Sequence, residues 1–214
     1  TNKNFSIFVR GKNLEMIETV VPTGQYIELV LGDGTKVWLN SKSTLTHPTR
    51  FKGSKRVVHL SGEGYFDVSH DPRHPFIVET SGYKIEVLGT EFNIRAYEGL
   101  YPFEASLLEG SIMVESTDMV ERLYLKPNER AVGEKDELKK TSFKEDELRW
   151  REGILFIDDK STHEILPILE QYYGVKFVIE NENLKKDKKF TGKFLIRDGI
   201  EHILNVFMLQ DYFN

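Results

Sequence analysis

The chain has 214 residues, which is enough for one large domain or two modest ones, each with a hydrophobic core. Its formal net charge is −5, and without a clustered basic surplus this argues against a nucleic-acid-binding protein. It contains no cysteine, which excludes thiol catalysis, disulfides and cysteine metal sites.

The first 20 residues carry only weak apolar spacing and are predicted to be a lead-in segment with at most one strand. The chain does not begin with Met, and its start lacks the charged and apolar regions of a signal peptide. No run approaches the ~20 apolar residues that cross a bilayer. We therefore expect an excised part of a longer protein, with residues 1–20 following a membrane helix that is absent here.

Residues 21–135 read as about ten short strands separated by turn residues. Apolar residues alternate over 27–31 and again over 37–39, and Asp33-Gly34 between them supplies the positive φ of a hairpin turn. Further turns are expected at Ser81-Gly82, Glu109-Gly110 and Pro127-Asn128. Because each strand has one apolar face to bury, the pattern predicts a mostly β fold, an antiparallel β-sandwich or jelly roll.

A different pattern follows this β region. Residues 136–150 are charged and are predicted to be a linker, and residues 151–214 are predicted to form a small α/β domain. It begins with a strand at 154–157 and a helix that starts at the capping box Ser161 to Glu164 and ends at Gly174. A strand is expected at 175–179, and then strand and helix repeat from residue 190. A strand should also follow the second helix, so this βαβ repeat is predicted to be incomplete.

Three runs in the β region carry a family resemblance: DGTKVWLN at 33–40, LSGEGYFDV at 60–68 and VLGTEFNIRAY at 87–97. Together with Val21-Pro22, Pro75-Phe76 and Leu125-x-Pro127 they stand in order over roughly residues 20–135. The chain thereby resembles the periplasmic region of FecR-family anti-sigma factors. The family more often has Ala at Gly64 and Glu at Asp67, and both differences are mild.

The second region also carries a resemblance, through Tyr172-Tyr173-Gly174 and Phe190-Thr191-Gly192-x-Phe194. It is similar to the short signalling domain of secretins and TonB-dependent receptors. The resemblance implies that the signalling domain of an outer-membrane TonB-dependent receptor binds this region in the periplasm. A single inner-membrane helix and a cytoplasmic segment, both absent here, would relay the signal to a sigma factor.

A candidate partner-binding strand lies in this second region, with no cofactor implied. Its residues are Phe190, Thr191, Gly192, Lys193 and Phe194. An exposed strand edge can receive a strand from a partner, with main-chain hydrogen bonds giving affinity. The alternative is an ordinary internal strand whose two phenylalanines belong to the core.

Gly89-Thr90 is a candidate self-cleavage site, because some FecR-like proteins resemble proteins that break at a Gly-Thr bond. In that mechanism the Thr90 hydroxyl attacks the preceding carbonyl, and the ester that forms is hydrolysed. The alternative is a turn or bulge glycine followed by a strand threonine. No other enzymatic activity is expected.

Two remaining groups contain residue types that can bind ligands. His70 and His74 with Asp67 and Asp71 lie in a proline-containing loop. Such a loop does not bring the two imidazoles together as a helix face would, so no metal site is expected.

A carbohydrate- or envelope-polymer-binding sandwich is the alternative to signal transduction. Its sugar platform would be formed by exposed aromatic residues such as Trp38, Tyr65 and Tyr83.

Overall fold

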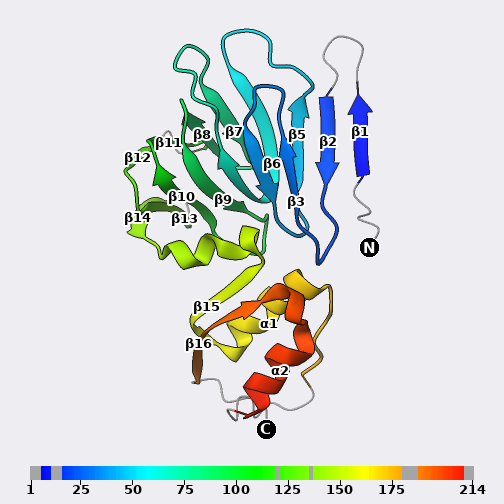
Figure 1. Cartoon of the computed structure of the whole chain (residues 1–214). Helices are drawn as coiled ribbons and strands as arrows, with labels where there is room; N and C mark the ends of the chain where they lie inside the picture. Colours follow the sequence, from blue (N-terminus) through cyan, green and yellow to red (C-terminus); the bar gives the residue numbers. More distant parts are fainter. Residues whose placement is uncertain (1–5, 11–15, 119–120, 135–136, 180–187, 210–214) are drawn as a thin grey trace. The chain divides into compact units, whose positions relative to one another are not determined.

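The structure is a computed structural model that describes residues 6–10, 16–118, 121–134, 137–179 and 188–209 (Figure 1). The chain divides into two compact units, Thr1–Glu145 and Asp146–Asn214. Each unit has its own hydrophobic core.

The first unit consists of strands. They are β1 (Ser6–Arg10), β2 (Met16–Val20), β3 (Ile27–Val30), β4 (Lys36–Leu39), β5 (Thr44–Pro48), β6 (Arg56–Asp67), β7 (Phe76–Glu79), β8 (Tyr83–Val87), β9 (Glu91–Ala96), β10 (Phe103–Glu109), β11 (Ile112–Ser116), β12 (Arg122–Leu125), β13 (Glu129–Glu134) and β14 (Glu137–Ser142).

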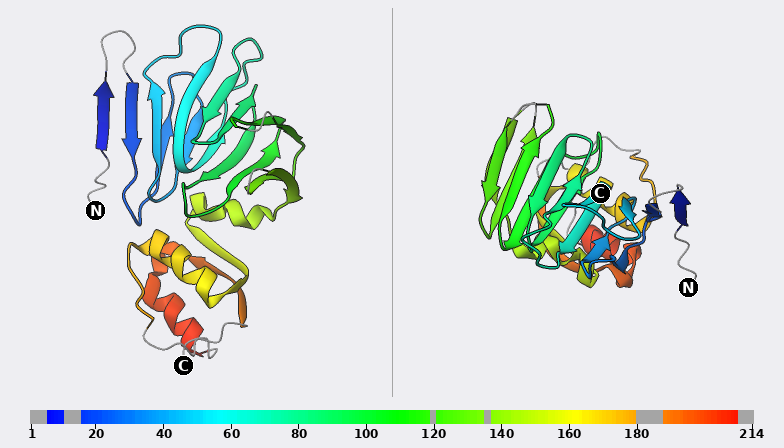
Figure 2. Two further views of the ribbon diagram at one scale, coloured as in Figure 1. Left: turned by 180° about the vertical axis from the view of Figure 1, so that it is seen from behind. Right: turned by 90° about the horizontal axis from the view of Figure 1, so that it is seen from above.

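These strands form two sheets that share β6 (Figures 1 and 2). Sheet A has the order β1-β2-β5-β6-β7-β8-β11-β12, and sheet B has the order β3-β4-β6-β9-β10-β13-β14. All neighbours are antiparallel except β6 and β7, which are parallel. Apolar side chains from both sheets meet in one core, in which Phe66 stacks on Phe92 at 5.2 Å. The predicted β-sandwich is therefore confirmed.

Strand β6 passes from one sheet to the other at Gly62. Residues before it pair with β5 and β7 in sheet A, and residues from Gly62 onward pair with β4 and β9 in sheet B. Gly62 has φ +103°, a conformation that residues with a Cβ rarely adopt. The Ser43 hydroxyl holds the bend, accepting a hydrogen bond from the Glu63 N–H at 2.8 Å and donating to the Glu63 carbonyl at 3.0 Å. Strands that switch sheets at such bends form the corners of β-sandwiches.

Two sequence-based predictions for the ends of this unit were wrong. The expected linker at 136–150 contains strand β14, paired along its length with β13. The short helical turn that the sequence suggested near Glu145–Trp150 is present as a 3₁₀ helix at Glu145–Glu152. As an edge strand, β14 keeps solvated charged side chains, so it lacks the apolar alternation by which strands are recognised. The lead-in segment contains two paired strands, β1 and β2, where at most one was expected.

The second unit contains a two-stranded antiparallel sheet of β15 (Ile154–Ser161) and β16 (Lys189–Leu195). Helices α1 (Thr162–Tyr173) and α2 (Ile200–Leu209) cover one face of this sheet (Figures 1 and 2). A short 3₁₀ helix (Ile196–Asp198) joins β16 to α2. The capping box is present: the Glu164 carboxylate accepts from the Ser161 N–H at 2.9 Å. Gly174 ends α1 with φ 68°.

The strand expected at 175–179 does not form. These residues have no regular secondary structure, and Val178 is 84% exposed. A strand needs a neighbour to bond its backbone groups, and no described segment lies in that position. The strand expected after α2 falls on residues 210–214, outside the described residues.

Candidate functional site

The predicted partner-binding residues lie on β16. Because side chains alternate along a strand, some of them face the core and the others face outward. Phe190 and Phe194 are 5% and 7% exposed and pack with Phe207 of α2 in the core. Thr191 and Lys193 point to the opposite face and are exposed. The alternative of core phenylalanines is therefore correct for those two side chains, while the strand keeps an exposed face.

The backbone of β16 also has two sides. The Ile196 N–H donates to the Gly153 carbonyl at 2.8 Å. In the antiparallel register of β15 and β16, every second residue of β16 from Ile196 backwards therefore directs its backbone N–H and C=O toward β15. By alternation, the backbone groups of Thr191, Lys193 and Leu195 point away from β15. Among the described residues β16 pairs only with β15, so this outer edge can accept an added strand.

Contacts with neighbouring groups fix the two exposed β16 side chains. The Thr191 hydroxyl accepts from the Asp159 N–H at 2.9 Å. The Lys193 ammonium is 2.7 Å from Asp146 and lies 5.5 Å from the centre of the Phe156 ring. The outer edge of β16 therefore belongs to an ordered strand and would lose little conformational entropy when a partner binds.

The geometry at Gly89-Thr90 fits the alternative of a turn glycine, since the chain bends at Leu88-Gly89 just before β9. A Cβ at Gly89 would lie 2.6 Å from the His70 Cα, so only glycine lets these two chain segments approach. Thr90 is 5% exposed, and its hydroxyl donates to the Ser111 carbonyl at 3.1 Å. Self-cleavage here stays a prediction.

Mass spectrometry of purified protein stored for several weeks tests that prediction. Self-cleavage yields a fragment that begins at Thr90, and this fragment should not form in a Thr90→Val variant. If the intact mass alone is found after storage, the bond does not break.

The His70–His74 loop contains a hydrogen bond between His74 and Asp71. His74 Nδ1 is 2.7 Å from the Asp71 carboxylate, and this hydrogen bond holds the pKa of Asp71 below its ordinary value. His70 instead packs against Gly89, and Asp67 is exposed on β6. Within the described residues no three metal-ligating side chains come together.

Arg56 forms a buried clamp that sequence reasoning missed. Its guanidinium is 2.7 Å from the Asp33 carboxylate and donates to the carbonyls of His74 and Ser69, both at 2.8 Å. The Arg56 side chain is 5% exposed. It ties the β3–β4 turn and the β6–β7 loop to the start of β6.

A second missed cluster surrounds Glu63 on sheet B. The buried Glu63 carboxylate accepts from the side-chain amides of Asn40 at 2.8 Å and Asn93 at 3.0 Å. Burial raises the pKa of Glu63, and the nearby Arg95 opposes that rise. Arg95 itself pairs with Glu104 at 2.5 Å. These polar residues fix the register of four neighbouring strands.

Comparison with known proteins connects both units to one family. The model of the FecR protein family matches residues 17–113, and the model of the FecR C-terminal region matches residues 154–213. The chain belongs to the FecR family. Its FecR-matched segment holds the Arg56 clamp, the Glu63 cluster and Gly89, and its C-terminal match holds β16.

Solved structures agree with this FecR assignment. Two crystal structures of a proposed anti-sigma factor from Parabacteroides distasonis ATCC 8503, at 2.50 and 1.65 Å resolution, match with a TM-score of 0.79 each. They are 27% and 28% identical to this chain, covering 91% and 90% of it and 91% of the other chain in each case. No curated protein sequence matches this chain. The general role of this FecR-family chain is that of an anti-sigma factor.

The structure does not bring the three aromatic residues of the alternative sugar platform together. Tyr65 is fully buried and meets Trp38 edge to face at 5.8 Å on sheet B. Tyr83 lies on β8 of sheet A and stacks on Phe103 at 3.9 Å. A buried ring cannot offer its face to a sugar, so these three residues do not form one platform.

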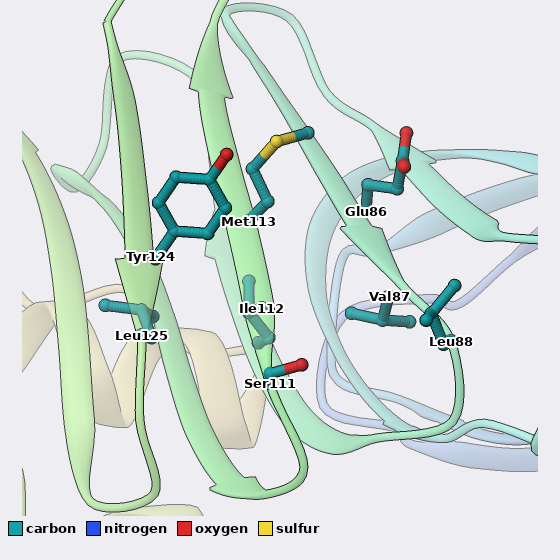
Figure 3. Close-up of a pocket in the computed structure, with 8 residues that line it drawn as sticks. All are labelled: Glu86, Val87, Leu88, Ser111, Ile112, Met113, Tyr124 and Leu125. Carbon is teal, nitrogen blue, oxygen red and sulfur yellow. The ribbon is translucent and has the colours of Figure 1, made fainter. Parts of the chain in front are cut away.

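A hollow of about 330 Å³ lies on sheet A of this FecR-family chain (Figure 3). Glu86, Met113 and Tyr124 face each other across β8, β11 and β12, and Leu88 stands beside them. Tyr124 is 64% exposed and Leu88 is 40% exposed. No acid–base pair converges on this mostly apolar surface.

A pH dependence follows from the buried His47 near the Arg56 clamp. Burial lowers the pKa of His47, against a smaller opposing effect of the Pro48 carbonyl. The unfolded chain therefore takes up a proton near pH 6.5 while the folded chain does not, so the contribution of His47 to stability is lost as the pH falls below about 6.5. A His47→Asn variant, which keeps a donor for the Pro48 carbonyl, should lose less stability between about pH 7 and pH 5.

Urea unfolding at both pH values measures this difference. Glu63 acts in the opposite direction, because a raised folded pKa removes stability as the pH rises through it. Comparing the variant with wild type isolates the His47 contribution. Equal losses in both proteins would contradict the assignment.

Proposed function

We propose that this chain is the periplasmic part of a transmembrane anti-sigma factor, which receives a signal from an outer-membrane TonB-dependent receptor and relays it to a cytoplasmic sigma factor. The second unit is the proposed receptor-binding part. In the longer protein a single inner-membrane helix would carry the signal. Among the described residues, no helix is long and apolar enough to cross a bilayer.

The observation that carries this proposal is the outer edge of β16. It lies in the segment matched by the FecR C-terminal model, and its outward backbone groups belong to Thr191, Lys193 and Leu195. A two-stranded sheet with core phenylalanines on one face offers a partner strand both register and main-chain bonds along Thr191–Leu195, where the described residues place no strand beyond β16. The first unit, a sandwich that contains the Arg56 and Glu63 clusters, serves as the scaffold.

A Thr191→Pro substitution tests the docking edge. Proline removes the outward N–H at this position and leaves the ladder with β15 in place, since Gly192 and Phe194 supply its bonds. Binding to purified signalling domains of TonB-dependent receptors from the same organism, measured by isothermal titration calorimetry, should weaken at least about tenfold.

A Thr191→Val variant is the matched control for this experiment. It also loses the hydroxyl that accepts from the Asp159 N–H, yet it keeps the outward backbone donor. It should bind as wild type does. Full affinity in Thr191→Pro would place the docking surface elsewhere, and absence of binding by the wild-type chain to every signalling domain would refute the proposed function itself.

A further inference from the structure

A second hollow, of about 190 Å³, lies in the first unit where the β7–β8 turn meets the β9–β10 loop. Both segments end strands of the sandwich, and the proposed receptor-binding strand does not contribute to it. Ten residues line it. Four of these ten carry an aromatic ring, which is a much higher proportion than the 12% of aromatic residues in the whole chain.

The four rings are held in two fixed pairs. Tyr83 stacks on Phe103 with ring centres 3.9 Å apart and planes at 16°. Tyr97 meets Tyr101 edge to face at 5.9 Å. The Tyr83 hydroxyl packs against Gly133, and the Tyr97 hydroxyl donates to the Ser41 carbonyl at 2.7 Å. Rings held in this way lose little conformational entropy when a ligand binds.

The rim of the hollow is polar and sterically open. Ser81 and Glu98 are exposed at its edge. A Cβ built at Gly82 or at Gly99 would meet no atom within 4 Å. The hollow therefore combines apolar ring surfaces inside with a hydroxyl and a carboxylate at the mouth, the pattern of a small-ligand site.

The charges select among possible ligands. The Arg95 guanidinium lies 5.1 Å over the centre of the Tyr101 ring, so one aromatic face already has a cation. That guanidinium is paired with Glu104 and covers this face of the ring, so a ligand cation could not stack there. A neutral ligand with an apolar face and hydrogen-bonding edges fits both the rings and the rim. Saccharide rings have this construction, with C–H groups on their faces and hydroxyls around them.

We propose that this hollow binds a neutral sugar unit of a glycan, with Tyr83 and Tyr101 providing the ring surfaces and Ser81 and Glu98 the polar contacts. The site is independent of the docking edge on β16. It would give the first unit a binding role in addition to that of a scaffold.

Saturation-transfer difference NMR on the whole chain tests this site. The probes are the methyl glycosides of glucose, galactose and mannose together with N-acetylglucosamine, and choline serves as a cationic comparison. At least one sugar should show transfer to its ring C–H protons, with a Kd of about 1 mM. Transfer should fall at least about fivefold in Tyr101→Ala and remain unchanged in Tyr124→Ala, which removes an exposed tyrosine elsewhere on the same unit.

A Ser81→Trp variant guards against misfolding in Tyr101→Ala, because Ser81 is an exposed turn residue and a tryptophan there would cover the hollow without disturbing the core. It too should abolish the transfer. Three results would overturn the proposal: no transfer to any of the four sugars, sugar transfer that persists in Ser81→Trp, or transfer to choline in place of the sugars.

Discussion

Replacing Gly62 with alanine should lower the free energy of unfolding of the first unit by about 3 kcal/mol or more. Two costs add at this position. Gly62 has φ +103°, and a Cβ there would lie 2.6 Å from the Cα and 2.5 Å from the hydroxyl oxygen of Ser43. Since the Cα is a backbone atom, the collision cannot be relieved by rotating a side chain. The bend that carries β6 between the sheets would have to open.

Gly53→Ala is the matched control for this prediction. Gly53 also has a positive φ, +95°, but a Cβ there would meet nothing within 4 Å. Gly53→Ala should lower the free energy of unfolding only by the cost of the positive φ, about 1 kcal/mol. Urea unfolding followed through Trp38, the one tryptophan of the first unit, measures both variants. Similar losses in the two variants would show that the contact with Ser43 is unimportant.

Replacing Arg56 with alanine is the second change with a large expected effect, a loss of about 3 kcal/mol or more in the free energy of unfolding. The substitution leaves the Asp33 carboxylate, whose side chain is 14% exposed, without its cation. It also removes the donors to the carbonyls of Ser69 and His74. The β3–β4 turn and the β6–β7 loop would separate, since this guanidinium bonds to both.

The control for Arg56 is an ion pair of similar length at the surface. Arg122 lies 2.7 Å from Glu115, but its side chain is 58% exposed. Because water and salt screen such pairs, Arg122→Ala should cost less than about 1 kcal/mol. The same urea experiment compares the two variants. A loss in Arg56→Ala no greater than in Arg122→Ala would contradict the role assigned to the clamp.

Local turn chemistry explains which strands could be predicted. The hairpin around Asp33-Gly34 was predicted correctly, because those two residues specify the turn by themselves. The continuity of β6 cannot be seen in the sequence, because glycines such as Gly62 and Gly64 are common in turns. Only the structure shows that Gly62 bends a continuous strand between two sheets.

The residues of the candidate site also show that local sequence signals do not reveal contacts between distant segments. A strand from residue 190 was predicted correctly, and Phe190 and Phe194, four residues apart, lie on its buried face as strand alternation requires. Which backbone groups of that strand point outward depends on its register with β15, and no local signal contains that register. The Arg56 clamp was missed because Asp33 lies 23 residues away in sequence and is brought close only by the topology.

The central claim, that a receptor signalling domain docks on the outer edge of β16, is tested most directly by amide hydrogen exchange followed by NMR. Exchange is compared for the chain alone and for its complex with a receptor signalling domain. The amides of Thr191, Lys193 and Leu195 should become protected in the complex, while those of Gly192 and Phe194, already bonded to β15, should change little. Protection confined to other strands, with the three outward amides of β16 exchanging as in the free chain, would contradict the account.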